Sequence, residues 1–252
     1  ARGLAVVIWQ DPALAELRLE LLTLEAQIVA LSSEQAELER QIEEFAHQQH
    51  VAVGEVMAEC LHLRREYWRL RAERSQAQAD QTAQAEAEAD QAEFQRDREA
   101  FEQAPRPATL DADQQQELKR LYREAVMRCH PDRVTEADQA AAQTIFVQVQ
   151  RAYQQGDLDT LNRLHRHLTE GQPFPDPAQV WTEQDQVRGR ISRLRLEVER
   201  RLAEIRALRA SETYQNLAAQ PDWAGYFATV RQRLEQECAE LRQKITERGN
   251  GG

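Results

Sequence analysis

Residues 117–132 read Glu-Leu-Lys-Arg-Leu-Tyr-Arg-Glu-Ala-Val-Met-Arg-Cys-His-Pro-Asp. Up to Cys129, the apolar side chains recur every three or four residues, which is the spacing of one face of a helix. Pro131 cannot continue a helix, and it biases His130 away from the helical backbone conformation. The stretch therefore predicts an amphipathic helix that ends in a loop of His130, Pro131 and Asp132, named here the His-Pro-Asp loop.

A second amphipathic segment follows this loop after a polar stretch. Phe146, Val149, Ala152 and Tyr153 again lie three or four residues apart, and Gly156 with Asp157 closes the segment. The sequence predicts two antiparallel helices whose connection presents the His-Pro-Asp loop.

With these motifs the chain resembles the J-domain (DnaJ) co-chaperone family over about residues 109–160. The family's second helix reads approximately E-I-K-K-A-Y-R-K-L-A-L-K-Y-H-P-D. The residues in register with it are Glu117, Leu118, Lys119, Arg120, Tyr122, Arg123, Arg128 and the His-Pro-Asp loop. The family's third helix carries F-x-x-I-x-x-A-Y, which the second segment matches. The resemblance implies a co-chaperone that binds a DnaK-type (heat-shock 70 class) chaperone and stimulates its ATP hydrolysis.

The resemblance also implies a role for each matched residue. The docking face would consist of Lys119, Arg120, Tyr122 and Arg123, and the trigger would be His130, Pro131 and Asp132, with Asp132 pairing with an arginine of the chaperone. The core of the module would consist of Leu118, Leu121, Phe146, Val149, Ala152 and Tyr153. Helical geometry supports this division, because Lys119, Arg120 and Arg123 cluster on one side of the helix and the leucines lie on the other.

The chain also departs from the family pattern. The short first helix of the family, D-Y-Y-x-x-L-G, has no match before residue 110. Either Phe94 and Phe101, or Leu110 together with the segments after Asp157, must then cover the helix pair. Glu124 stands where the family often has a basic residue, which weakens the positive docking face. The Gly/Phe-rich linker and the Cys-x-x-Cys-x-Gly-x-Gly repeats of the larger family members are absent from this sequence.

Composition bounds the rest of the protein. The chain has 252 residues, 30% of them charged, nine glycines and a mean hydropathy of -0.74, which favours elongated helices over one large core. A net charge of -11 argues against a general nucleic-acid or anionic-membrane surface. The apolar run Leu4 to Trp9 is too short for a signal segment or a membrane span, so we expect a cytoplasmic protein.

Cys60, Cys129 and Cys238 are far apart and predict packed, reduced thiols.

The sequence contains no recognisable catalytic or metal-binding motif. His165 and His167 do not share a helical face, and His47 with His50 lacks an accompanying carboxylate or thiol cluster, so we expect no metal site. A nucleophile with its base, a phosphate-binding loop and a paired-carboxylate motif are also missing. We therefore expect a binding protein without a cofactor rather than an enzyme.

The N-terminal region, residues 11–103, carries a coiled-coil pattern. Apolar residues alternate steps of three and four, interrupted only by Gln35: Leu14, Leu17, Leu21, Leu24, Ile28, Leu31, Leu38, Ile42 and Phe45. Asp11 and Pro12 favour a helix start. A second stripe from Val53 to Leu70 is out of phase, which indicates a stutter in one helix or a turn between two; the lack of proline in residues 46–54 favours one helix. Residues 75–92 predict a thinly packed helical spacer that Pro105 and Pro107 end.

The C-terminal region, residues 178–248, predicts a second helical pairing. It follows the J-domain-like module of residues 109–170 and a linker, Gly171 to Pro177. One heptad stripe consists of Val187, Ile191, Leu194, Val198, Leu202, Ile205 and Leu208, and the next of Tyr226, Val230, Leu234, Cys238, Leu241 and Ile245. The break between them contains Pro221, so we expect an antiparallel helical hairpin. The predicted fold class is all-α: a J-domain helical hairpin, long coiled-coil helices and this C-terminal hairpin.

These features leave several partners open. The coiled coils would hold an unknown client protein or complex for the chaperone. The N-terminal stripe must be covered, and a homodimer through it is the expected solution, with back-folding within the chain or a different protein as the alternatives. The competing functions are a coiled-coil scaffold whose J-like module no longer stimulates the chaperone, and a helical protein associated with nucleic acid, which the net charge disfavours.

Overall fold

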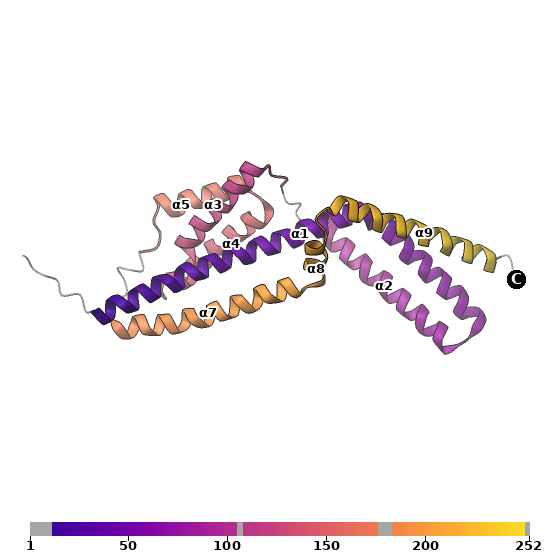
Figure 1. The fold of residues 1–252 in the computed structure, drawn as a ribbon, viewed down its shortest axis with the longest axis horizontal. Coiled ribbons are helices and arrows are strands. Elements are labelled where there is room, and N and C mark those ends of the chain that lie inside the picture. The colour runs from indigo at the N-terminus through magenta and orange to yellow at the C-terminus, as the bar shows by residue number, and fades with distance from the viewer. Residues whose placement is uncertain (1–11, 105–107, 176–182, 250–252) are drawn as a thin grey trace, which may run out of the picture. The chain divides into compact units, whose positions relative to one another are not determined.

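The computed structural model describes residues 12–104, 108–175 and 183–249, and each element in them is a helix (Figure 1). In chain order they are α1 (Pro12–Ser75), α2 (Gln78–Gln103), α3 (Ala112–Cys129), the 3₁₀ turn η1 (Pro131–Arg133), α4 (Gln139–Gln155), α5 (Leu158–Glu170), α7 (Gln184–Ala210), α8 (Glu212–Ala219) and α9 (Trp223–Gly249). The all-α prediction is confirmed. The expectations for Leu4 to Trp9, Asp11, Pro105, Pro107 and the end of the linker at Pro177 lie outside the described residues. No described helix has a stretch apolar and long enough to span a membrane.

Helix α1 is continuous over 64 residues and passes through Gly54. This confirms one long helix with a stutter over a turn between two helices. The helix ends where Gln76 takes the left-handed conformation with φ of 50°. At this point Asp80, near the start of α2, accepts a hydrogen bond from Ser75 and pairs with Arg71 at 2.8 Å. Residues 75–92 are therefore largely helical, as expected, but a tight turn divides them between two helices.

The chain forms two compact units, residues 1–41 with 106–211 and residues 42–105 with 212–252. Helix α7 belongs to the first unit, whereas α8 and α9 belong to the second. The predicted C-terminal hairpin is therefore corrected, because its two helices belong to different compact units. The long seam of α1 gives each of them a partner: Arg209 of α7 pairs with Glu34 at 2.5 Å, and Glu237 of α9 pairs with Arg64 at 2.5 Å.

The second unit has an apolar core between the later part of α1 and the C-terminal helices. Its buried residues are Phe45, Val53, Val56, Cys60, Leu217, Phe227, Leu234, Cys238 and Leu241. Phe45 is the centre of an aromatic cluster, with its ring edge-to-face on Trp223 at 5.2 Å and 5.1 Å from Phe227. The ring of Phe101, near the end of α2, lies 3.9 Å from the ring of His50, so α2 packs against α1 beyond the thinly packed spacer predicted for residues 75–92.

In the first unit, α3, α4 and α5 form the J-domain-like module. Its start and end follow local rules: Asp111 caps α3 through a reciprocal bond with Gln114, and α4 ends at the left-handed Gly156 with φ of 66°. All six residues predicted for the module core are buried, from Leu118 of α3 to Tyr153 of α4. The predicted helix pair is confirmed, and these six residues lie in its buried core.

Helices α1 and α5 replace the family's missing first helix. Val29 and Ala36 of α1 and Leu161 and Leu168 of α5 join the module core, with Leu110 partly buried against it. Of the two alternatives considered for this cover, Leu110 with the segments after Asp157 is confirmed. The contribution of α1 was not predicted. It comes from a second buried face of small and polar residues, Glu25, Val29, Ser32 and Ala36, beside the leucine stripe.

The leucine stripe of α1 is largely buried within the chain itself. Leu21, Ile28, Leu31 and Leu38 are buried in the first unit, and Phe45 in the second. This is the back-folding alternative, and it removes the reason for which we expected a homodimer.

Candidate functional site

The His-Pro-Asp loop forms where α3 ends. His130 takes an extended conformation, and Pro131 starts the single 3₁₀ turn that ends at Arg133. The Arg133 amide donates to the His130 carbonyl oxygen at 2.8 Å, and the Asp132 amide faces the Nδ1 atom of His130 at 3.2 Å. The loop is thus a defined turn, as its proline predicts.

His130 is the most enclosed residue of this loop, with 0% of its surface exposed. Its ring meets Phe146 of α4 edge-on at 4.9 Å, and its Nε2 atom lies 3.2 Å from the guanidinium of Arg201 on α7. Both ring nitrogens face N–H donors; a neutral ring accepts at one of them, whereas a protonated ring accepts at neither. Burial first, and then Arg201 and the neighbouring arginines, lower the pKa of His130 to about 3.

Asp132 lies at the edge of a hollow of about 550 Å³ between the loop and α7. Its carboxylate is 33% exposed, 3.6 Å from the Nδ1 atom of His130. Burial, followed by the nearby Glu197, raises the pKa of Asp132 above its usual range. From α7, Glu197, Arg200, Arg201 and Glu204 line the same hollow. The carboxylate expected to pair with an arginine of a chaperone therefore faces charged residues of its own chain.

A buried group of charged residues holds the loop against α1 and α7. Arg133, directly after the loop, pairs with Glu25 of α1 at 3.2 Å, and Arg190 of α7 approaches the same carboxylate at 3.9 Å. Arg201 pairs with Glu197 at 2.9 Å. Glu25, Arg190 and Arg201 are all buried. Such buried ions need a partner, and each has one here.

Sequence reasoning missed these α7 arginines, although one signal was present. The α7 stripe keeps a strict alternation of four- and three-residue steps only if Arg201 replaces Leu202 in it. In the structure Arg201 is buried and Leu202 is 38% exposed. The regular spacing was the better guide, and the apolar character of Leu202 misled us.

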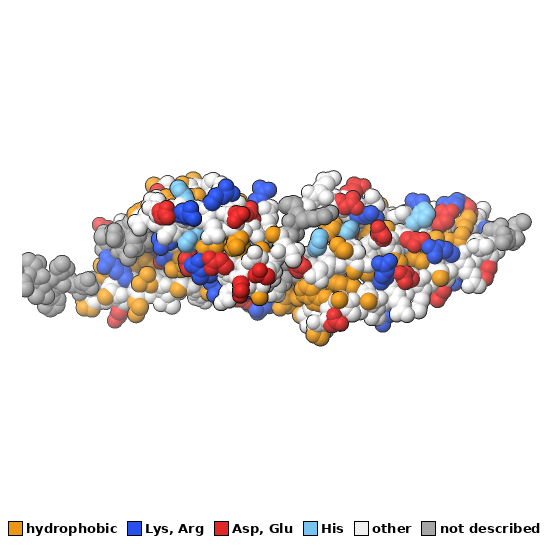
Figure 2. All heavy atoms as spheres, turned by 90° about the horizontal axis from the view of Figure 1, so that it is seen from above, with side chains coloured by type: hydrophobic (Ala, Val, Ile, Leu, Met, Phe, Trp, Pro, Cys, Tyr) orange, Lys and Arg blue, Asp and Glu red, His pale blue; other side chains and the backbone are white. Residues whose placement is uncertain are grey.

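The basic residues predicted for docking lie together along α3, where Lys119, Arg120 and Arg123 line one shallow hollow. Arg120 is held by Glu117 and Glu124 of its own helix, both at 2.7 Å, and these bonds raise its pKa. Lys119 pairs with Glu37 of α1 at 3.0 Å. Basic and acidic side chains are interspersed on the face in Figure 2, which agrees with this pairing.

Two residues of α3 make contacts that the sequence did not predict. Tyr122, expected on the docking face, is 1% exposed and its ring packs against Tyr153 at 4.3 Å, so it belongs to the core. Glu124, which weakens the positive face, also pairs with His165 of α5 at 2.7 Å. Glu124 therefore joins α3 to α5 in addition to its bond with Arg120.

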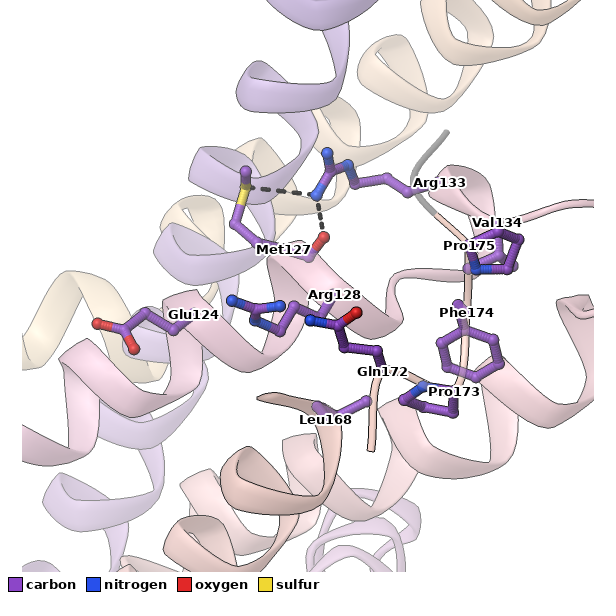
Figure 3. A pocket seen from close by; sticks show the side chains of 10 residues that line it. All are labelled: Glu124, Met127, Arg128, Arg133, Val134, Leu168, Gln172, Pro173, Phe174 and Pro175. Carbon is purple, nitrogen blue, oxygen red and sulfur yellow. Dashed lines mark hydrogen bonds between the residues drawn. The ribbon is translucent and has the colours of Figure 1, made fainter. Parts of the chain in front are cut away.

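A second hollow, of about 690 Å³, is lined in part by Arg133 (Figure 3). Met127, Arg128 and the segment Gln172 to Pro175 line it, and Phe174 lies along one side. Arg133 donates to the carbonyl oxygen of Met127 and contacts its sulfur at 3.7 Å. The same side chain reaches Glu25, so Arg133 links the end of α3 to α1.

Two of the histidine side chains and the three cysteines contact other side chains or are buried in the fold. In residues 12–104, 108–175 and 183–249, no group of three or more His, Cys, Asp or Glu side chains is arranged to hold a metal ion. His47 and His50 contact Phe101, and the cysteines at 60, 129 and 238 are buried and free. Burial raises the pKa of Cys60 and Cys129 to about 12, so their thiols stay protonated.

Comparison with known families agrees with this geometry. Residues 109–155 match the DnaJ domain family model, so this part of the chain is a J-domain. No curated protein and no solved structure matches the chain. The matched residues begin before α3 and end with α4, and they include the complete His-Pro-Asp loop.

Proposed function

We propose that this J-domain protein is a co-chaperone that binds a DnaK-type chaperone through α3 and the His-Pro-Asp loop. It stimulates ATP hydrolysis by that chaperone and directs it to a client or complex held by the long helices. The observation that carries the proposal is the intact tripeptide His130-Pro131-Asp132, which closes α3 within the matched family segment. The protein itself acts by binding, and the catalytic chemistry is that of the chaperone.

Docking through α3 is electrostatic in this proposal. Arg123 is exposed, and Lys119 and Arg120 reach the surface beside it. Exposed charges of this kind speed the encounter and orient the partner, and they contribute less to the lifetime of the complex. Glu117 and Glu124 offset part of this charge, so we expect weak docking that salt reduces further.

The test is single-turnover ATP hydrolysis by a DnaK-type chaperone at increasing concentrations of the full chain. The rate should rise and saturate, and His130→Gln should abolish the rise. His167→Gln is the matched control, because His167 is exposed on α5 and away from the loop, and it should behave like the wild type. Stimulation that survives His130→Gln would refute this mechanism.

The alternative is a coiled-coil scaffold in which the J-domain packs but does not stimulate. One observation favours it: His130 is fully enclosed and contacts Arg201 of the same chain. The two functions differ in whether the loop acts once it is uncovered.

A further inference from the structure

The loop that the proposed function requires at the surface is covered by the chain's own helices. Arg201 of α7 contacts the ring of His130, and Glu25 of α1 holds Arg133 directly after the loop. The hollow beside Asp132 is lined by further α7 side chains. A chaperone cannot contact the His130 ring while α7 remains in this position.

Helix α1 also engages the docking face. Lys119 pairs with Glu37 of α1 at 3.0 Å, and the same carboxylate accepts from the Tyr153 hydroxyl at 2.7 Å. Burial alone would raise the pKa of Glu37, but the hydrogen bonds from Tyr153 and Lys119 lower it, so the group is an anion. Helix α1 thus provides Lys119 with the acidic partner that the proposed chaperone would otherwise supply.

We propose that α7, together with the first part of α1, is an autoinhibitory clamp over the His-Pro-Asp loop. In the clamped state the J-domain is folded but the His130 ring is enclosed and Asp132 is partly covered, and release of α7 exposes both side chains fully to the chaperone. The inhibitory role rests on the proposed function, whereas the covering of the loop by α7 can be tested without it.

The composition of α7 makes the clamp releasable. Its buried face contains Arg190 and Arg201 in addition to Val187, Ile191, Leu194, Val198 and Ile205. Burial of a charged side chain costs free energy that its ion pair only partly returns, so a seam with such residues is weaker than an apolar seam of the same length. Arg201 faces His130 of the loop, and Arg190 faces Glu25 of α1, the carboxylate that also holds Arg133.

Two leucines on α7 provide a matched pair of variants. Leu194 is 1% exposed, and Leu196, two residues further on the same helix, is 72% exposed. Leu194→Asp introduces a carboxylate into the buried face and should release α7. Leu196→Asp makes the same chemical change on the solvent side and should leave the clamp closed.

The first readout is the reaction of His130 with diethyl pyrocarbonate in the full chain, followed by mass spectrometry of its peptide. Only an accessible, unprotonated imidazole reacts, and His47, His50 and His62 of the other unit serve as internal references. We expect Leu194→Asp to raise the rate at His130 about tenfold or more over wild type, and Leu196→Asp to leave it unchanged. An unchanged rate in the released variant would overturn the clamp.

The second readout is the chain concentration needed for half-maximal stimulation of the chaperone's ATPase. It should fall about tenfold for Leu194→Asp, and His130→Gln added to Leu194→Asp should abolish the stimulation. If His130 becomes reactive but no chain stimulates, α7 does cover the loop but the proposed function fails, and the inhibitory role fails with it. If the wild type already stimulates as strongly as the released variant, the clamp is refuted while the function stands.

A second pair of variants covers the case in which Leu194→Asp misfolds, which circular dichroism would reveal. Ile205→Asp lies on the same buried face as Leu194, and Leu202→Asp on its exposed flank. The same contrast between the two variants is expected, and its absence would overturn the clamp.

Discussion

Helix α1 takes part in two seams of different character. In the second unit its partner α9 contributes Phe227, Leu234, Cys238 and Leu241, and the buried cluster there is apolar. In the first unit its partner α7 contributes buried Arg190 and Arg201, which lie near Glu25 and the His-Pro-Asp loop. A long helix can thus form an apolar core along one part and a partly charged contact along another.

Shortening a buried side chain in the apolar seam should give the largest loss in the free energy of unfolding. Phe45→Ala removes a ring that is 1% exposed and packed against other aromatic rings, so it should cost the second unit about 3–5 kcal/mol. The measurement is hydrogen exchange of α9 peptides, with urea unfolding followed by circular dichroism. Val51→Ala, at a residue 69% exposed, is the matched control. A comparable loss of protection in α7 would erase the distinction between the seams.

Mild acid, down to pH 5, should weaken the α7 seam more than the α9 seam. His130 is buried and neutral beside Arg133, Arg190 and Arg201, with its pKa lowered to about 3. Its stabilising effect is complete above the unfolded pKa near 6.5 and is lost progressively as the pH falls from there toward the folded pKa. The raised pKa of Asp132 acts in the opposite direction, since its effect is lost as the pH rises.

Between pH 7 and pH 5 the α7 contact should therefore lose about 1–2 kcal/mol. Hydrogen exchange of α7 and α9 peptides, corrected for the intrinsic pH dependence of exchange, measures this directly. His130→Gln should remove most of the pH dependence of α7, with α9 unaffected. Equal pH dependence in the two helices would show that His130 is not its source.

The smallest effect concerns the arginine contact itself. Arg201→Met should raise the pKa of His130, because Arg201 is the largest charged contributor to lowering it. The pKa should stay below the ordinary value, since burial is the first cause and persists. Arg200→Met is the control, because Arg200 contributes less and its side chain is largely exposed. An NMR titration of the His130 ring in which both variants give the same shift would contradict the assigned contact.

Local features of this protein could be predicted from its sequence, whereas the pairing of its helices could not. The core of the J-domain and the start of the His-Pro-Asp loop follow from apolar spacing and from the geometry of Pro131, which are local properties. The pairing of helices does not follow, because heptad seams resemble one another and the stripe of α7 fits α9 as well as it fits α1. Tyr122 lies at the border between two helix faces, and only tertiary packing against Tyr153 decides its side.

Glu25 could not have been predicted as a site residue from the sequence alone. It lies beside the leucine stripe of α1, where an exposed carboxylate is the ordinary expectation. Its role depends on Arg133 and Arg190, which come from segments more than a hundred residues away in the chain. Arg201 is different, since strict heptad spacing points to its position, although the sequence analysis chose the apolar Leu202 instead.

The central claim is that α7 reversibly covers a competent His-Pro-Asp loop. It is tested most directly with one cross-linkable variant, measured first locked and then released. Glu34→Cys with Arg209→Cys places two thiols where an ion pair joins α1 to α7, and the native cysteines are buried. A reducible bismaleimide then locks the clamp, and the stimulation of a DnaK-type ATPase is measured before and after reduction. The locked chain should not stimulate, and reduction should restore stimulation. Equal stimulation in both states would contradict the account.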